Sequence, residues 1–238
     1  MTTLPSSAIS PKSADQPLQA TLTTPPLAPL LERLFRDNEA SFHEHPAMAA
    51  LSEAERDRRL RSKTGYLDFY GQLRDLPLAV SRETATLLYV LARGCRARSI
   101  VEFGTSFGVS TLHLAAALRD NGGGRLITSE FEPSKAARAR DNLASADLAD
   151  LVDIRQGDAL HTLATGLPDS VDMLLLDGAK ALYPEILGLI EPHLRPGALI
   201  IADDAGYSPD YLARVRSPAR GYLSIPFAED VELSVRLG

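Results

Sequence analysis

The chain has 238 residues and a formal net charge of −6, so it fits one domain with an N-terminal extension. The acidic balance disfavours a nucleic-acid partner, because nucleic acids are bound through clustered positive charge. The single cysteine excludes an intramolecular disulfide and a Cys-x-x-Cys site, and no apolar run has the length of a membrane span or the pattern of a signal peptide. We therefore expect a cytoplasmic protein with a small-molecule substrate, bound to neither nucleic acid nor membrane.

The N-terminal third divides into two parts. Residues 1–29 hold six of the sixteen prolines and only two charged side chains, a composition that predicts a flexible tail. Residues 30–80 are expected to form a helical extension that serves as a lid or a dimer contact. Its signals are a helical apolar rhythm from Leu27 to Glu39, a capping box from Ser52 to Glu55, and apolar side chains between Tyr66 and Leu78 that suit a homodimer contact.

From residue 81 to residue 238 the sequence alternates strand and helix signals, which is typical of a mostly parallel sheet covered on both faces. The strands are predicted at residues 99–103, 125–130, 151–155, 171–177 and 197–202, and the helices at about 82–94, 108–119, 133–145, 159–165 and 180–193. The dipeptide Pro196-Gly197 is expected to break the chain before the fifth strand. Residues 221–227 and 231–237 predict an antiparallel hairpin at one sheet edge. The predicted fold class is therefore α/β: a Rossmann-like, doubly wound, seven-stranded sheet with extra N-terminal helices.

The first predicted strand runs into the turn Glu102-x-Gly104-x-x-x-Gly108. In a dinucleotide-binding turn, glycines let the backbone approach a pyrophosphate, and a carboxylate there would repel the phosphates. The same turn suits a nucleoside with a cationic tail, and S-adenosylmethionine is the common cofactor of that kind. The alternative is an ordinary strand-turn-helix junction.

Glu130 ends the second predicted strand, about 20 residues beyond the turn. A carboxylate at that place can accept hydrogen bonds from both hydroxyls of a ribose. Glu130 is therefore the predicted ribose ligand, with a favourable charge at the N-terminus of the next helix as the alternative.

Acidic residues also follow the fourth and fifth strands. Asp177 ends the fourth strand, with Lys180 three residues later, and Asp203 and Asp204 end the fifth. If the two strands are neighbours, three carboxylates converge and need positive charge among them. Lys180 and a divalent cation such as Mg²⁺ are the candidates, and Lys180 could accept a proton if burial and the cation depress its pKa. The alternative is that the aspartates cap helices and Lys180 pairs with them on the surface.

Taken together, these segments resemble a known family. VEFGTSFGVSTLHLA, GDAL, LLLDGAKALY and LRPGALIIADD are similar to the cofactor loop, the adenine-side turn, the metal and base segment and the fifth strand of class I S-adenosylmethionine-dependent methyltransferases. Within that class they resemble the cation-dependent O-methyltransferases of the catechol and caffeoyl-CoA type. The resemblance covers residues 78–204 well and the C-terminal hairpin more loosely.

The resemblance implies site residues as well as a fold. Glu102 and Gly104 would line the methionine end of the cofactor, Glu130 would hold the ribose, and Asp158 with Ala159 would contact the adenine. The full implied cofactor set is Glu102, Gly104, Thr105, Ser106, Gly108, Ser110, Glu130, Asp158, Ala159 and Asp177. The implied catalytic residues are Lys180, as general base, and Asp177, with Tyr183 nearby, and the implied metal ligands are Asp177, Asp203 and Asp204. Asp204 departs from the family, which usually has asparagine there.

The predicted function is S-adenosylmethionine-dependent methyl transfer to a hydroxyl of a small molecule, assisted by a divalent cation such as Mg²⁺. One alternative is a metal-independent methyltransferase with a nitrogen or carboxylate acceptor. Another is a nucleotide-binding protein without catalysis.

Overall fold

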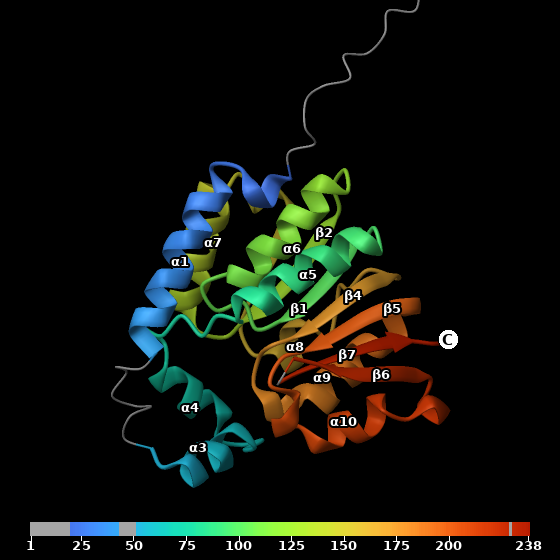
Figure 1. Cartoon of the computed structure of the whole chain (residues 1–238). Coiled ribbons are helices and arrows are strands. Elements are labelled where there is room, and N and C mark those ends of the chain that lie inside the picture. The colour runs from blue at the N-terminus through green and yellow to red at the C-terminus, as the bar shows by residue number, and fades with distance from the viewer. Residues whose placement is uncertain (1–19, 43–50, 229) are drawn as a thin grey trace, which may run out of the picture.

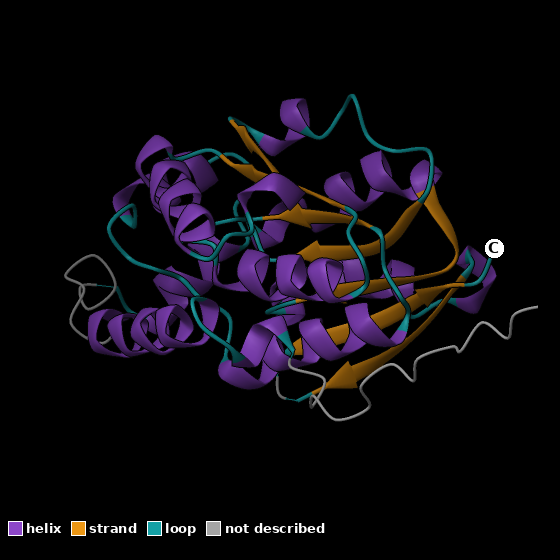
Figure 2. Ribbon diagram, turned by 90° about the horizontal axis from the view of Figure 1, so that it is seen from above, coloured by secondary structure: helices purple, strands orange, loops and turns teal. Residues whose placement is uncertain are grey.

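The computed structural model describes residues 20–42, 51–228 and 230–238. Its centre is a mixed sheet of seven strands with helices on both faces (Figure 1), and a view at 90° shows the strands between the helical layers (Figure 2). No helix in these residues has the length and apolarity needed to cross a membrane.

The sheet has the order β3-β2-β1-β4-β5-β7-β6. The five parallel strands are β1 (Ser99–Phe103), β2 (Arg125–Glu130), β3 (Val152–Gln156), β4 (Val171–Leu176) and β5 (Leu194–Ala202). The hairpin strands β6 (Tyr222–Phe227) and β7 (Val231–Arg236) are antiparallel, and β7 pairs with β5. The winding direction reverses between β1 and β4, which is where ligands bind in open α/β sheets. The predicted fold class is confirmed.

Helices fill both sides of the sheet. One side carries α1 (Leu27–Phe42), α5 (Arg82–Gly94), α6 (Val109–Asp120) and α7 (Pro133–Ser145), and the other carries α8 (Ala159–Thr162), α9 (Tyr183–Ile190) and α10 (Pro209–Val215). Successive strand residues alternate between the two cores: Ile100 packs on the α5–α6 side and Val101 on the α9 side. The period-two pattern of buried side chains thus sets which face each helix covers.

A smaller helical unit lies at the end of the sheet where the parallel strands finish. It comprises α3 (Glu53–Leu60) and α4 (Tyr66–Gln72), with its own core of Phe69, Leu73 and Leu76. Ser52 begins α3 by accepting a hydrogen bond from the backbone N–H of Glu55, as the capping box predicts. This unit covers the loops that follow the strands.

Two sequence predictions need correction. The predicted tail of residues 1–29 extends too far, because the backbone N–H and hydroxyl of Thr21 donate to the Asp120 carboxylate and Leu27 is fully buried at the start of α1. Residues 1–19 lie outside the described residues. Pro196 and Gly197 do not break the chain before β5 but lie within it, at an irregularity where the pairing with β4 shifts register.

Candidate active site

The carboxyl ends of β1 and β4 meet almost without a gap. The backbone N–H of Asp177 donates to the carbonyl of Phe103 at 2.8 Å, which extends the strand pairing into the loops. A Cβ atom on Gly104 would lie 2.5 Å from the carbonyl oxygen of Asp177, and the φ of Gly104 is +102°. Only glycine suits this close approach with this backbone conformation.

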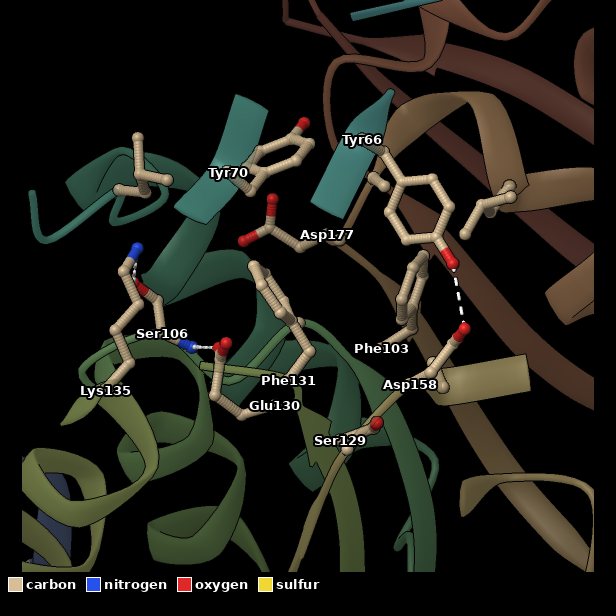
Figure 3. A pocket seen from close by; sticks show the side chains of 17 residues that line it. Tyr66, Tyr70, Phe103, Ser106, Ser129, Glu130, Phe131, Lys135, Asp158 and Asp177 are labelled. Carbon is tan, nitrogen blue, oxygen red and sulfur yellow. Dashed lines mark hydrogen bonds between the residues drawn. The ribbon is translucent and has the colours of Figure 1, made fainter. Parts of the chain in front are cut away.

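A first cavity of about 610 Å³, including its mouth, opens over this junction. We call it the nucleoside cavity, because the predicted ribose ligand Glu130 lines it. Asp158 and Asp177 line it as well, so acidic side chains from the ends of β2, β3 and β4 face the same space (Figure 3). Gly104, Ser106 and Ala159 of the predicted cofactor set line it too, as do Phe103, Phe131, Tyr66 and Tyr70. The lining of the cavity is therefore aromatic and acidic. Among the described residues that line it, Lys135 supplies the positively charged side chain.

Glu130 is held in place by the loops around it. Its carboxylate accepts hydrogen bonds from the backbone N–H groups of Ser106, at 2.8 Å, and Glu132, at 2.9 Å. Burial raises the pKa of this carboxyl above its ordinary value. The side chain still faces the cavity at the end of β2, the place where a ribose ligand is predicted.

Asp158 links the sheet to the N-terminal helices. One carboxylate oxygen accepts from the backbone N–H of Leu160 and so caps α8, and the other accepts from the Tyr66 hydroxyl at 2.9 Å. Burial, followed by the bond to Asp158, raises the pKa of Tyr66 to about 12. Helix α4 is thus attached directly to the loop that follows β3.

Lys135 is a cavity residue that sequence reasoning missed. Its side chain is 4% exposed, and its Nζ lies 3.4 Å from the Ser106 hydroxyl, which donates in turn to the carbonyl of Pro77. Burial lowers its pKa to about 8, although Glu130 and other acids oppose this shift. The sequence feature that could have indicated Lys135 is its position in the first turn of α7, five residues after Glu130.

Glu102 does not line the cavity, contrary to prediction. The side chain is fully buried and accepts hydrogen bonds from the hydroxyls of Ser110 and Thr111, both at 2.6 Å. Burial raises its pKa. Its carboxylate therefore fixes the start of α6 against β1 and is not placed to contact a ligand. The predicted residues Thr105, Gly108 and Ser110 also lie outside the residues that line the cavity.

A second cavity of about 850 Å³, including its mouth, lies beside the first. We call it the acceptor cavity. Tyr70, Leu78, Asp177 and Gly178 line both cavities, so the two meet at the end of β4. One end of the acceptor cavity holds Lys180, Asp203 and Asp204, and the other is formed by α3 and α4 with the side chains Arg56, Leu60, Phe69 and Leu73.

The predicted lysine–carboxylate cluster is present. The Nζ atom of Lys180 lies 2.8 Å from Asp177, 3.6 Å from Asp203 and 3.5 Å from Asp204. Lys180 is 5% exposed, and no aspartate of the cluster makes a side-chain cap to the helix that follows it. The alternative of surface pairing and helix caps is therefore wrong.

The carboxylates around Lys180 determine the direction in which its pKa is shifted. Burial alone would lower its pKa, but the Asp177 carboxylate, the Tyr183 phenol and the two other aspartates together raise it well above its ordinary value. Burial and the neighbouring Asp177 carboxylate raise the pKa of Asp203 to about 8. The carboxylates that face Lys180 therefore favour its ammonium form.

Tyr183 lies under the cluster, as the resemblance implies. Its hydroxyl donates to the carbonyl of Asp203 at 2.7 Å, and its ring packs edge-on against Phe103. Among the described residues, no group of three or more His, Cys, Asp or Glu side chains has an arrangement that could hold a metal ion. The three carboxylates meet at the ammonium of Lys180 instead.

Comparisons with known proteins agree with this geometry. A family model described as a methyltransferase domain matches residues 101–205. The chain is 38% identical over 130 residues to a catechol O-methyltransferase of Niastella koreensis, covering 53% of this chain and 58% of that protein. The chain thus spans less than two thirds of that relative's length.

Two further relatives align over more of their own length. The chain is 31% identical over 152 residues to a protein of Mycobacterium sp. (strain JLS) assigned to the O-methyltransferases, covering 60% of this chain and 68% of that protein. The solved structure of the O-methyltransferase TomG from Streptomyces achromogenes, determined in complex with SAM, superposes with a TM-score of 0.58. That match has 27% identity and covers 86% of this chain and 99% of TomG. The chain therefore belongs to the class I S-adenosylmethionine-dependent O-methyltransferases.

Proposed function

We propose that the protein transfers a methyl group from S-adenosylmethionine to a hydroxyl of a small molecule. The observation that carries this proposal is the wall shared by the two cavities. Asp177 and Gly178 line a cavity suited to a nucleoside on one side and a cavity that ends in Lys180 on the other. A donor and an acceptor bound there would meet at the end of β4.

The lining of the nucleoside cavity supports a definite orientation of the cofactor. Asp158 and Ala159 would contact the adenine, Glu130 would accept from the ribose hydroxyls, and Gly104 would lie along the methionine part. The sulfonium would then face the acidic end near Asp177, where negative charge favours a cation. The described residues that line the nucleoside cavity supply three carboxylates and the single ammonium of Lys135, so the net negative charge of the cavity disfavours a pyrophosphate there.

The reaction is an in-line displacement. An oxygen lone pair of the acceptor forms the new bond to the methyl carbon while the carbon–sulfur bond breaks. The electron pair of the broken bond stays on the sulfur and neutralises the sulfonium. Alignment of the two reactants, with solvent excluded by α3 and α4, can supply about 7–11 kcal/mol of barrier reduction. Lys180 would accept the hydroxyl proton, a role that requires its neutral amine.

We further propose that Asp177, Asp203 and Asp204 rearrange to hold a divalent cation such as Mg²⁺, since in the described residues they face the Lys180 ammonium and are not arranged as a metal site. Their carboxylate oxygens are the donors that hard cations prefer. Each carboxylate lies within 3.6 Å of the Nζ atom of Lys180, so the three lie close to one another. Such a cation would supply a Lewis acid that makes an acceptor hydroxyl more acidic. It would also neutralise the charges that keep Lys180 protonated.

The extension of residues 30–80 is proposed as a lid, because Tyr66 of α4 lines the nucleoside cavity and Tyr70 of the same helix lines both cavities. The predicted homodimer and the cytoplasmic location stay predictions. Of the apolar side chains of α4, Phe69 is buried in the small core whereas Leu67 is exposed. Sedimentation velocity would measure the oligomeric state.

Turnover with labelled S-adenosylmethionine tests the function. A panel of catechols, phenols and amines is assayed with Mg²⁺ and with a chelator. Methyl transfer to a hydroxyl that stops with the chelator supports the full proposal. Transfer to an amine or carboxylate that ignores the chelator would support the metal-independent alternative, and cofactor binding without any transfer would support a non-catalytic protein.

A further inference from the structure

Tyr70 occupies a distinctive place between the two cavities. It lies on α4, and its side chain lines the nucleoside cavity and the acceptor cavity. Figure 3 shows its ring beside the carboxylate of Asp177. A ligand group that passes from one cavity to the other would therefore pass this side chain.

The Tyr70 hydroxyl is buried, and among the described residues no acceptor takes its proton. The backbone N–H of Lys180 acts to lower the pKa of this hydroxyl, but it is a donor and offers no acceptor for the phenolic proton. Leaving such a group unpaired destabilises a folded protein. Because the Tyr70 side chain lines both cavities, a ligand that enters them is a candidate source of the missing acceptor.

Tyr66 provides an internal comparison. It lies one turn earlier on the same helix, and its hydroxyl donates to Asp158 in the nucleoside cavity. The two phenols thus point to neighbouring sites, one satisfied by the protein and one not.

The Tyr70 hydroxyl keeps its proton at neutral pH. Burial raises its pKa to about 12, Lys180 acts against this shift, and Asp177 and Asp204 add to it. The hydroxyl is therefore a hydrogen-bond donor that needs an oxygen or nitrogen lone pair. The acceptor cavity is where an oxygen-bearing substrate is expected.

We propose that the Tyr70 hydroxyl donates a hydrogen bond to an oxygen of the methyl acceptor where the two cavities meet. This bond holds the acceptor in line with the methyl group of the cofactor. The inference rests on the proposed function and adds a residue from the N-terminal helices to the acceptor site.

The test compares Tyr70→Phe with Tyr66→Phe in the full chain, using the best acceptor of the panel. Removing the Tyr70 hydroxyl is expected to lower kcat/KM for the acceptor about tenfold, mainly through KM, as the loss of one hydrogen bond implies. The dissociation constant for S-adenosylmethionine should stay within twofold of the wild-type value. The melting temperature should stay equal or rise, because a buried hydroxyl without an acceptor has been removed.

Tyr66→Phe should show the opposite pattern, with weaker cofactor binding. Tyr89→Phe is a remote control, because its hydroxyl donates to Asp120 outside both cavities. It should lower stability and leave kcat/KM unchanged.

Two results would overturn the inference alone. An unchanged kcat/KM in Tyr70→Phe would show that the hydroxyl binds nothing during turnover. A weakened cofactor affinity with an unchanged acceptor KM would assign it to the cofactor instead. Absence of methyl transfer by the wild-type protein would overturn the proposed function itself, a failure that is visible before any variant is made.

Discussion

The hydroxyl of Tyr66 donates a 2.9 Å hydrogen bond to the carboxylate of Asp158, across 92 residues of sequence. This bond joins α4 to the loop after β3 at the wall of the nucleoside cavity. Tyr66→Phe is expected to raise the dissociation constant for S-adenosylmethionine about 2- to 10-fold, since a net hydrogen bond contributes about 0.5–1.5 kcal/mol. Isothermal titration calorimetry measures the change. A lower melting temperature with unchanged affinity would instead mean that the bond serves folding alone.

We expect the stability of the protein to depend on pH because of the lowered pKa of the buried Lys135. Its pKa of about 8 in the folded protein lies below its ordinary value of 10.5, so between these pH values the unfolded chain binds more protons. Wild-type stability should therefore gain from this residue as the pH rises from 8 to 10.5. Below pH 8 the buried ammonium costs about 3 kcal/mol.

Lys135→Met tests this expectation. The variant should be more stable than wild type at pH 7, by up to about 3 kcal/mol, and the difference should shrink by pH 10. Urea denaturation at both pH values measures it. A difference that does not change between pH 7 and pH 10 would show that Lys135 does not titrate in this range.

Gly104 is expected to tolerate no side chain. Gly104→Ala places a Cβ 2.5 Å from the carbonyl oxygen of Asp177 at a φ of +102°, so the ends of β1 and β4 must separate. We expect a loss of about 2–4 kcal/mol in the free energy of unfolding, from backbone strain and the forced displacement. Gly71→Ala is the matched control, because nothing lies within 4 Å of its added Cβ in α4. That control should gain about 0.5–1 kcal/mol from helix propensity, and equal effects of both variants would contradict the close approach.

Asp177→Asn separates chemistry from cofactor binding. Asp177 lies at the wall of both cavities and 2.8 Å from Lys180, so the loss of its charge should lower turnover at least about 100-fold. Cofactor affinity should fall much less than turnover, because only the attraction of Asp177 for the sulfonium is lost while Glu130 and Asp158 keep their contacts. Rapid-quench turnover and calorimetry on the same preparation measure the two effects. If both fall equally, the carboxylate is a part of the fold of the cavity and not of the reaction.

The strand ends were the predictable part of the site. Parallel strands finish at the same edge of a sheet, so Asp177, Asp203 and Lys180 could be placed together from their positions after apolar runs. The residue bounds of β1 and β2 were predicted correctly for the same reason, because buried runs and glycine turns mark them.

Other parts of the site depend on packing that no local pattern encodes. Tyr66 and Tyr70 reach the cavities because α4 folds over the strand ends, a contact between segments far apart in the sequence. Glu102 is held by Ser110 and Thr111, and its position in the turn motif gave no sign of this. The raised pKa of Lys180 follows from the three carboxylates around it, which outweigh its burial.

The central claim is that the nucleoside cavity binds a cofactor with a cationic sulfur and no phosphate. Titration calorimetry of the wild-type protein with S-adenosylmethionine and, separately, with NAD tests it most directly. We predict saturable one-to-one binding of S-adenosylmethionine, weakened in Glu130→Gln, and no binding of NAD at the same concentrations. Tighter binding of NAD than of S-adenosylmethionine would contradict the account.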